Sequence, residues 1–373
     1  MFFQLNYLIL VNLDNSLQNY LNHLFPLMTL LFDLLHLLIL QAFYCHNRVV
    51  NFYLSYINHY YYMKNIQSNI KKAKNFLDKS HCVAVPTETV YGLAGNAYSD
   101  SAVKKIFYLK RRPANNPLIV HYYNLKKISE DCEINDSFIK LYKKFSPGPI
   151  TYVLKLKKNS KISKFVTNNK KTVAIRFPKH PLFRKLLKNL EYPVAAPSAN
   201  ISSRLSAVKA IDVKEEFGNK IKFILNGGVC KIGVESTIIS IINKPRLLRY
   251  GGLGVTKIKK TLNQKIIINI NSKDKISPGL FPLHYSPGLP LRMNAKKNKK
   301  EEAFVLLKKR KNISKNIYYL SKTNNLNEAA KNLYSVLRKI KKDKYKSIAV
   351  EKIPNRGIGK TINDRLKRAS NFK

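Results

Sequence analysis

The stretch of residues 83–121 constrains the fold more than any other part of the sequence. It begins with a short apolar run, residues 83–85, which Pro86 ends, and this pattern predicts a strand that leads into a loop. The loop, residues 86–92, offers two threonine hydroxyls, one carboxylate and one phenol. A second apolar run, residues 118–120, predicts another strand at the end of the stretch.

A basic helix is expected between these two strands. Residues 101–109 have the apolar spacing of a helix that ends in Lys110, Arg111 and Arg112, and Pro113 prevents its continuation. We expect both strands to end at one edge of a sheet, with hydroxyl groups on one side and three cations on the other. This arrangement suits a substrate with a small polar end and a polyanionic end. The alternative is a purely structural unit whose basic helix end is solvated.

The remaining chain predicts an α/β protein in two parts. Helices and strands alternate, and short turns join several strands, so we expect an open twisted mixed sheet with helices over residues 63–271. Residues 272–295 predict a Pro/Gly-rich linker packed over the active site, and residues 296–373 a smaller Rossmann-like α/β domain. The predicted elements include helices over 136–145, 181–190 and 326–341, strands over 151–156, 194–196 and 303–308, and a turn at 250–252 into which residues 247–249 lead.

Residues 1–62 form a hydrophobic extension that differs from the rest, with no lysine and one arginine. Residues 24–44 are apolar enough to suggest a membrane helix, but Pro26, Asp33 and His36 interrupt them. We therefore favour a protein start at Met63 over a membrane anchor, and we expect no membrane partner. A membrane-tethered scaffold is the function that an anchor would favour.

Three segments carry a resemblance to a known family. PTETVYGL, the Lys-x-Arg-Pro cluster and NPLIVH resemble, in order and spacing, the threonylcarbamoyl-AMP synthase family, also called YrdC-like proteins. The resemblance covers about residues 64–370, and the tail is similar to the two-domain form with a C-terminal extension. It implies a nucleotidyltransferase that forms threonylcarbamoyl-AMP and pyrophosphate from L-threonine, bicarbonate and ATP. A downstream transferase then modifies an adenosine of tRNA, and direct contact of this chain with tRNA stays open.

The resemblance also implies two sets of binding residues. Arg176, at a strand end, is the candidate for the threonine carboxylate, because a guanidinium offers two coplanar donors. The positions implied for L-threonine are Thr89, His121, Arg176, Ala196 and Ser236. The positions implied for ATP are Lys110, Arg112, Asn116, Thr172, Ser198, Ser206, Arg249 and Tyr285. No catalytic residue is implied, and Lys110, Arg112 and Arg176 would act by positioning.

Taken singly, these residues indicate less. Each serine or threonine is more typical of a turn or a cap, and His121 of a histidine that caps a core. Three positions also depart from the family pattern: Ser203 replaces a common glycine, Tyr250 replaces a common proline, and Arg111 adds a cation.

The chemistry implied by the resemblance needs alignment of anions more than acids and bases. Threonine's amine attacks carbonate and the carbamate attacks the α-phosphate, so a cationic site that aligns anions is sufficient. Glu88 and Glu235 are the only acids within the motifs, and we interpret both as structural or orienting. We expect Mg²⁺ to be carried largely by the phosphates, with no protein metal site. Residues 357–361 end like a phosphate-binding loop, but Pro354 stands where its first glycine is required.

The charge of the chain favours anionic partners. Lys and Arg number 68 against 21 Asp and Glu, a net charge of +47, which suits nucleotide, RNA or an acidic membrane. Codon bias is an alternative source of the lysines, because Asn, Ile, Tyr and Phe are also abundant. The chief rival function is a non-catalytic RNA-binding module with the same fold. The four cysteines are scattered, which predicts no disulfide or zinc site and favours a reducing, cytoplasmic compartment.

Overall fold

The computed structural model describes residues 64–270, 284–310 and 314–372. The chain divides into two units at residue 65, and the fold described below is that of the second unit, which begins at residue 66. The hydrophobic extension predicted over residues 1–62 lies outside the described residues, as does the first half of the predicted linker, residues 272–283. None of the helices within the described ranges is long and apolar enough to cross a membrane.

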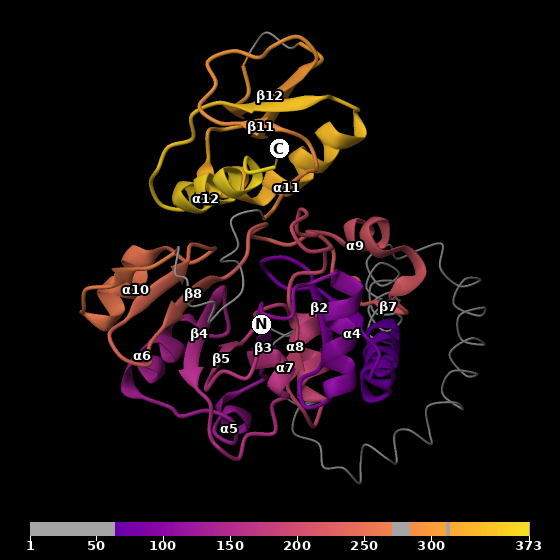
Figure 1. Cartoon of the computed structure of the whole chain (residues 1–373), viewed down its shortest axis with the longest axis vertical. Coiled ribbons are helices and arrows are strands. Elements are labelled where there is room, and N and C mark those ends of the chain that lie inside the picture. Colours follow the sequence, from indigo (N-terminus) through magenta and orange to yellow (C-terminus); the bar gives the residue numbers. More distant parts are fainter. Residues whose placement is uncertain (1–63, 271–283, 311–313, 373) are drawn as a thin grey trace, which may run out of the picture. The chain divides into compact units, whose positions relative to one another are not determined.

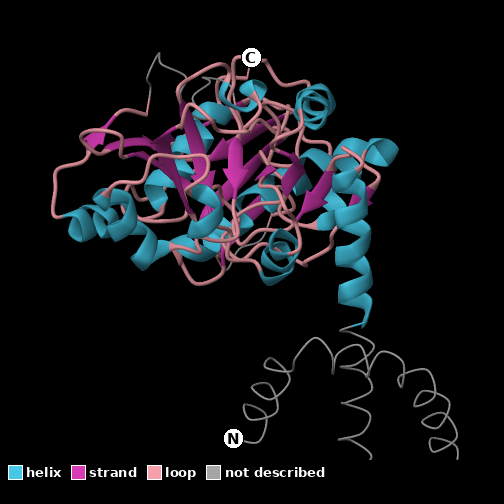
Figure 2. Cartoon of the chain, turned by 90° about the horizontal axis from the view of Figure 1, so that it is seen from below, coloured by secondary structure: helices cyan, strands magenta, loops and turns pink. Residues whose placement is uncertain are grey.

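The second unit contains a large mixed sheet (Figures 1 and 2). Within the described residues its ten strands have the order β10-β9-β8-β4-β5-β3-β6-β2-β1-β7. The strands are β1 (Val83–Val85), β2 (Gly92–Asn96), β3 (Ile119–His121), β4 (Ile150–Lys155), β5 (Thr172–Arg176), β6 (Val194–Ala195), β7 (Phe223–Ile224), β8 (Thr237–Ser240), β9 (Arg246–Arg249) and β10 (Ile267–Ile268).

The direction of the strands corrects one expectation. The pairs β1–β2, β2–β6 and β6–β3 are all antiparallel, so β1 and β3 run in opposite directions. The prediction that both strands end at one edge is therefore wrong. Its cause is β2, which the sequence analysis did not predict because two of its five residues are glycines, which are rare inside strands. The loop after β1 and the basic segment before β3 nevertheless lie at the same edge.

Helices cover both sides of this sheet (Figure 2). A helix over residues 64–78 precedes β1. The others are α4 (Asp100–Lys110), α5 (Leu125–Ile128), α6 (Asp136–Phe145), α7 (Lys164–Thr167), α8 (Pro181–Lys188), α9 (Ala210–Phe217), the 3₁₀ turn η1 (Gly218–Lys220) and α10 (Val255–Leu262). Each of the longer ones has an apolar face: α6, for example, buries Phe138 and Leu141 and begins after Asn135, whose side chain accepts a hydrogen bond from the Phe138 amide.

Alternation along the strands produces two cores. In β1, Ala84 packs into the larger core, whereas Val83 and Val85 pack into a core beneath the helix over 64–78 and α8. Likewise Val120 of β3 faces the larger core, so its neighbours Ile119 and His121 face the opposite side. That second face, where apolar packing gives way to polar side chains, is where the candidate site lies.

A smaller sheet follows, with the order β11-β14-β12-β13 and only parallel pairs. Its strands are β11 (Leu291–Arg292), β12 (Glu302–Lys308), β13 (Ile317–Ser321) and β14 (Ser347–Val350). Helices α11 (Leu326–Lys342) and α12 (Gly359–Ala369) lie together on one side of this sheet (Figure 1). We call residues 291–372 the C-terminal module. Its parallel α/β architecture agrees with the Rossmann-like prediction, although β11 forms within residues predicted as linker.

Candidate functional site

The loop after β1 is held rigidly by its own hydroxyl groups. The Thr87 hydroxyl donates to the Val90 carbonyl oxygen at 2.7 Å and accepts from the amides of Thr89 and Val90. The carbonyls of Glu88 and Thr89 in turn accept from backbone amides of residues 232 and 233. The loop is therefore fixed over the sheet, with Thr87, Glu88 and Thr89 all buried.

Arg176, at the end of β5, meets this loop. Its Nη2 donates to Glu88 Oε1 at 2.7 Å and to the Thr89 hydroxyl at 2.8 Å. The other carboxylate oxygen of Glu88 accepts from the Lys179 amide. The Nε of Arg176 is buried and has no hydrogen-bond partner. Glu88 thus orients the guanidinium, as interpreted from the sequence, and one buried donor is left for a ligand.

Arg176 and two further arginines line one cavity. The cavity measures about 40 Å³ and draws its walls from the loop after β1, β3, β5, the segment after β6, the start of β8, the end of β9 and residues 284–285. Its lining includes eight of the predicted site residues, which are Arg112, His121, Arg176, Ala196, Ser198, Ser236, Arg249 and Tyr285.

Lys110 and Arg112 build the side of the cavity next to α4. Arg112 donates from Nε and Nη2 to the backbone carbonyls of Asn116 and Pro117, both at 2.9 Å. Lys110 Nζ donates to the carbonyls of Ser198 and Asn200, each at 2.5 Å. The two side chains therefore anchor the segment before β3 and the segment after β6, and they bring both cations to the edge where β3 begins.

Arg249 and Ser236 form another wall. Arg249, at the end of β9, donates to the Ser236 carbonyl from Nε and Nη2 and to the Ser236 hydroxyl from Nη2. The Ser236 hydroxyl also lies 2.7 Å from that of Thr151. The turn expected at residues 250–252 directly follows β9, a strand that the sequence analysis did not predict and that pairs with β8.

The cations of this pocket are held at an electrostatic cost. Burial, together with the charge of Arg249, lowers the pKa of Arg112 to about 9. Burial and the charge of Arg112 hold the pKa of Lys110 well below its ordinary value, and burial lowers the pKa of Arg249. Crowded, desolvated cations of this kind are stabilised when a polyanion binds among them.

His121 is neutral in this setting. Burial, followed by the charge of Arg176, lowers the pKa of His121 to about 3. Its ring packs 5.4 Å from that of Phe183, between centroids, while its Nδ1 is buried without a partner. The residue therefore combines the core-capping role considered from the sequence with an open polar atom at the cavity.

Five predicted residues stand outside the cavity lining, and one of them is Lys110, whose contacts are given above. The Thr89 hydroxyl accepts a hydrogen bond from Arg176 Nη2, and the Ser206 hydroxyl donates to Glu235 Oε1 at 2.6 Å. Asn116 is buried, and its carbonyl accepts from Arg112. Thr172 begins β5, four residues before Arg176 and about 13 Å from it along the strand. Thr172 is not among the residues that line the cavity, its hydroxyl is buried without a hydrogen-bond partner, and its contact with ATP stays a prediction.

Other contributors were not predicted as site residues. Glu235 and His284 line the cavity, and Arg365 and Tyr334 of the C-terminal module hydrogen-bond to Glu235. The available signal for the last two was only their place in the similar C-terminal tail.

Two departures from the family pattern can now be placed. Ser203 has φ 68°, in the left-handed region that favours glycine, so the backbone keeps the conformation that a glycine would adopt. Tyr250 presents its carbonyl oxygen to Arg365 Nη2 at 2.8 Å, a contact that the substitution of proline leaves possible.

The pocket does not resemble a protein metal site. Among the described residues, no group of three or more His, Cys, Asp or Glu side chains is placed to hold a metal ion. The nearest acids, Glu88 and Glu235, are both occupied by arginine.

Comparisons with known proteins agree with this geometry. Residues 75–251 match the family described as telomere recombination, and residues 253–371 match the threonylcarbamoyl-AMP synthase C-terminal domain. Threonylcarbamoyl-AMP synthase of Pyrococcus abyssi is 36% identical over 325 residues, which cover 82% of this chain and 94% of that protein. The Bacillus subtilis protein of the same name is 34% identical over 322 residues, or 81% and 92%. A crystal structure of P. abyssi Sua5 complexed with L-threonine has a TM-score of 0.75 and 34% identity, covering 81% of this chain and 94% of that one.

Proposed function

The chain belongs to the threonylcarbamoyl-AMP synthase family, and we propose that it forms threonylcarbamoyl-AMP and pyrophosphate from L-threonine, bicarbonate and ATP in the cavity described above. The observation that carries this proposal is the convergence of Arg176, Arg112 and Arg249 on one cavity. Arg176 is oriented by the Glu88 carboxylate, and Arg112 and Arg249 are buried cations whose charges oppose each other.

L-threonine is proposed to bind at Arg176. The buried, unpartnered Nε and the fixed orientation of the guanidinium suit a carboxylate. The hydroxyl of Ser236 and the Nδ1 of His121 also face this cavity and can accept or donate hydrogen bonds to the amine and hydroxyl of threonine. The P. abyssi structure complexed with L-threonine supports an amino-acid site in this fold.

ATP is proposed to bind on the side of Lys110, Arg112 and Arg249. These cations are crowded and desolvated, so a triphosphate relieves their mutual repulsion. Ser198 and Tyr285 line the same cavity.

The proposed reaction proceeds in two steps. The amine of threonine attacks the carbon of bicarbonate, and loss of hydroxide as water gives the carbamate. A carbamate oxygen then attacks the α-phosphate of ATP, the bond to the β-phosphate oxygen breaks, and pyrophosphate leaves. Because the bonds change between bound anions, the protein contributes alignment and charge neutralisation. Mg²⁺ is proposed to arrive on the phosphates, since the pocket's own acids are occupied by arginine.

Entry of ATP requires rearrangement. A cavity of about 40 Å³ is far smaller than the roughly 300–1,000 Å³ typical of ligand pockets. Tyr285 is buried at its wall, and its backbone has φ 61°, an uncommon conformation for a bulky residue. We propose that residues 284–285 and the C-terminal module act as a lid that opens for ATP and limits loss of the labile product.

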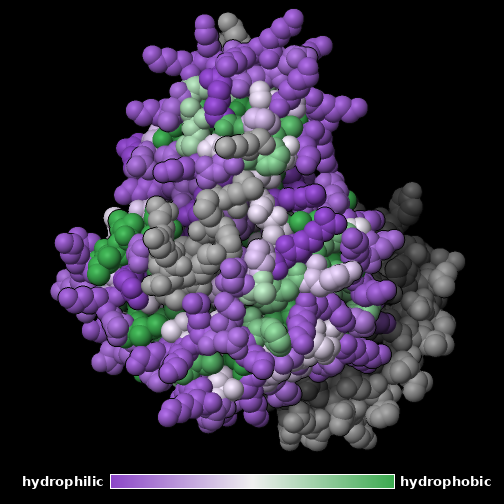
Figure 3. Space-filling view, viewed as in Figure 1, coloured by the Kyte–Doolittle hydropathy of each residue, from purple (hydrophilic) through white to green (hydrophobic). Residues whose placement is uncertain are grey.

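The cellular setting is part of the proposal. Cys82, Cys132 and Cys230 are free and buried, which favours a reducing, cytoplasmic compartment. Hydrophilic side chains cover most of the described part of the face drawn in Figure 3, and the net charge of +47 suits anionic partners. The product is proposed to pass to a separate threonylcarbamoyl transferase that acts on tRNA, with or without direct contact between this chain and the tRNA.

The test is pyrophosphate release with ATP, L-threonine and bicarbonate each withheld in turn. Release that requires all three is the expected result. Salt-sensitive RNA binding without such release would instead favour the non-catalytic RNA-binding module.

A further inference from the structure

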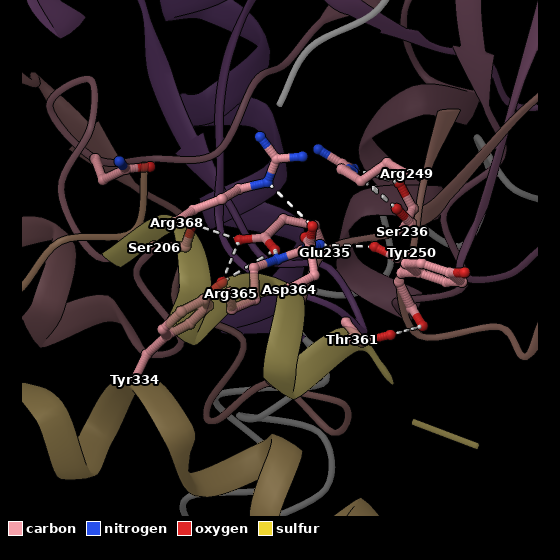
Figure 4. A network of polar contacts seen from close by, with 12 residues as sticks. Ser206, Glu235, Ser236, Arg249, Tyr250, Tyr334, Thr361, Asp364, Arg365 and Arg368 are labelled. Atoms are coloured by element: carbon pink, nitrogen blue, oxygen red, sulfur yellow. Dashed lines mark hydrogen bonds and ion pairs between the residues drawn. The ribbon is translucent and has the colours of Figure 1, made fainter. Parts of the chain in front are cut away.

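One buried carboxylate, that of Glu235, is bound by a side chain from the loop between β6 and α9 and by side chains from α11 and α12 of the C-terminal module (Figure 4). The Ser206 hydroxyl donates to its Oε1 at 2.6 Å from the large-sheet side. From the C-terminal module, Tyr334 Oη approaches both carboxylate oxygens, at 3.0 and 3.1 Å, and Arg365 Nε donates to Oε2 at 2.7 Å. Glu235 also lines the cavity, immediately before Ser236.

Arg365 is buried beside Glu235, and its guanidinium group contacts several segments of the chain. Its side chain is 1% exposed, and it is among the largest fully buried side chains in the described part of the chain. Besides Glu235, it donates from Nη2 to the Tyr250 carbonyl at 2.8 Å and from Nη1 to Asp364. Its guanidinium carbon lies 4.6 Å from the centroid of the Tyr285 ring. The Arg365 guanidinium therefore contacts three segments that meet at the cavity wall.

The same helix, α12, makes another contact with this wall. The Thr361 hydroxyl donates to the Gly251 carbonyl at 3.0 Å. Gly251 lies against the start of β8 so closely that a Cβ there would be 2.2 Å from the Ser236 carbonyl carbon. Helix α12 thus fixes the segment that joins Arg249 to the turn after β9, at the place where it packs on Ser236.

Two arginines, Arg365 and Arg249, lie near the carboxylate of Glu235 and stabilise its charge. Burial opposes ionisation of Glu235, but the charges of Arg365 and then Arg249 outweigh burial and lower the pKa of Glu235 to about 2. Glu235 is therefore an anion with two nearby arginines, of which Arg365 makes the direct ion pair. If Arg365 were absent, Arg249 would be the remaining cation available to that carboxylate.

We infer that Arg365 is a positioning residue for ATP: by pairing with Glu235, it leaves Arg249 free to face the nucleotide. The C-terminal module then completes the ATP side of the pocket without touching the substrate. This inference rests on the proposed function for its ligand, and it assigns to Arg365 and Tyr334 a role in the affinity for ATP more than in that for threonine.

The experiment measures ATP affinity directly, by calorimetry on the full chain, beside pyrophosphate release. Arg365→Met is expected to weaken ATP binding by about 10-fold or more, the effect typical of lost supporting contacts around a site. L-threonine affinity is expected to fall less than ATP affinity, because the Arg176–Glu88 pair is untouched although Arg249 also binds Ser236. Adding Glu235→Gln to Arg365→Met is expected to restore most of the ATP affinity, because no unpaired carboxylate then competes for Arg249. Because an unpaired buried carboxylate also costs stability, ATP affinity is compared only among variants that circular dichroism shows to be folded. A merely structural role then predicts no loss of ATP affinity in folded Arg365→Met.

Two further variants keep the test decisive. Tyr334→Phe removes one hydroxyl from Glu235 and keeps the ring, so a smaller loss of ATP affinity is expected even if Arg365→Met fails to fold. Arg292→Ala is the matched control, since Arg292 pairs with Glu302 at 2.6 Å within the C-terminal module and does not line the cavity.

The outcomes separate the two proposals. ATP affinity unchanged in Arg365→Met, no recovery in the double variant, or an equal loss in Arg292→Ala would overturn the inference. If the wild type and the variants bind ATP with the expected order of affinities but the wild type releases no pyrophosphate, the proposed function is refuted and the inference stands. Absence of ATP binding by the wild type would overturn both.

Discussion

Replacing Arg176 with alanine tests the threonine site, but the structure shows that this change has two effects. The first is on stability, because Arg176 and Glu88 are both nearly inaccessible and 2.7 Å apart. Loss of the guanidinium leaves the Glu88 carboxylate buried without a cation. Breaking a buried pair in this way costs about 3–5 kcal/mol, a large share of the roughly 5–15 kcal/mol that stabilises a typical domain.

The second effect is on threonine binding. A hydrogen bond to a charged group contributes about 1.5–3 kcal/mol, and about 1.4 kcal/mol corresponds to tenfold in affinity. Loss of the Nε donor alone should therefore weaken L-threonine about 10- to 100-fold. To isolate this effect, Glu88→Gln is combined with Arg176→Ala, which removes both charges and the stability cost of the unpaired carboxylate.

The assay is pyrophosphate release as a function of L-threonine concentration at saturating ATP and bicarbonate, after circular dichroism has established that the double variant is folded. We expect a raised KM for threonine and an unchanged KM for ATP. Glu88→Gln alone is the control for the loop, since it keeps the guanidinium. A folded double variant with the wild-type KM for threonine would refute the assignment of Arg176.

Three further expectations follow from burial. Because the pKa of His121 is lowered from 6.5 to about 3, the unfolded chain takes up a proton below about pH 6.5 that the folded chain does not. The stability due to neutral His121 is therefore complete above that pH and falls toward pH 3, by about 1.4 kcal/mol per pH unit. His121→Gln should remove this contribution to the slope of unfolding free energy against pH between pH 6.5 and 5. An unchanged slope in the variant would contradict the prediction. Burial raises the pKa of Cys82 and Cys230 to about 12, so neither thiol should react with iodoacetamide at pH 8 until the protein unfolds. Peptide mapping that finds either cysteine alkylated in native protein after a brief reaction would disprove this. Gly251→Ala should lower the free energy of unfolding by about 1–3 kcal/mol through overpacking and reduce pyrophosphate release. A variant with the denaturation midpoint of the wild type would show that the segment after β9 tolerates the added Cβ.

Local patterns in the sequence were sufficient for most elements. Helix α6 has the predicted bounds, and α11 and β12 differ from theirs by one residue. Each has a strong periodicity and a clear boundary, such as the side chain of Asn325 that caps α11. The elements that the sequence did not indicate are short or lack apolar alternation: β2 has two glycines, and β11 has only two residues.

Contacts distant in sequence were beyond such reasoning. Strand direction depends on pairing, and the insertion of β2 and β6 between β1 and β3 reversed the predicted arrangement. Eight of the residues predicted from the family resemblance line one cavity. The resemblance gave no reason, however, to connect Arg365 with Glu235, which are 130 residues apart. It also placed Thr172 among the ATP contacts; this residue begins β5, toward the edge where β3 begins, and its role stays a prediction.

The two glutamates explain how three guanidinium groups can line one small cavity and remain available to a ligand. A buried arginine needs a partner, and a carboxylate placed inside the cavity would repel the substrates. Glu88 solves this for Arg176 by binding one end of its guanidinium and leaving Nε open. Glu235 is instead paired by Arg365, from outside the cavity, so its negative charge is already compensated where Arg249 faces the pocket. The acids thus fix the geometry of the cations without cancelling the positive charge that anionic substrates require.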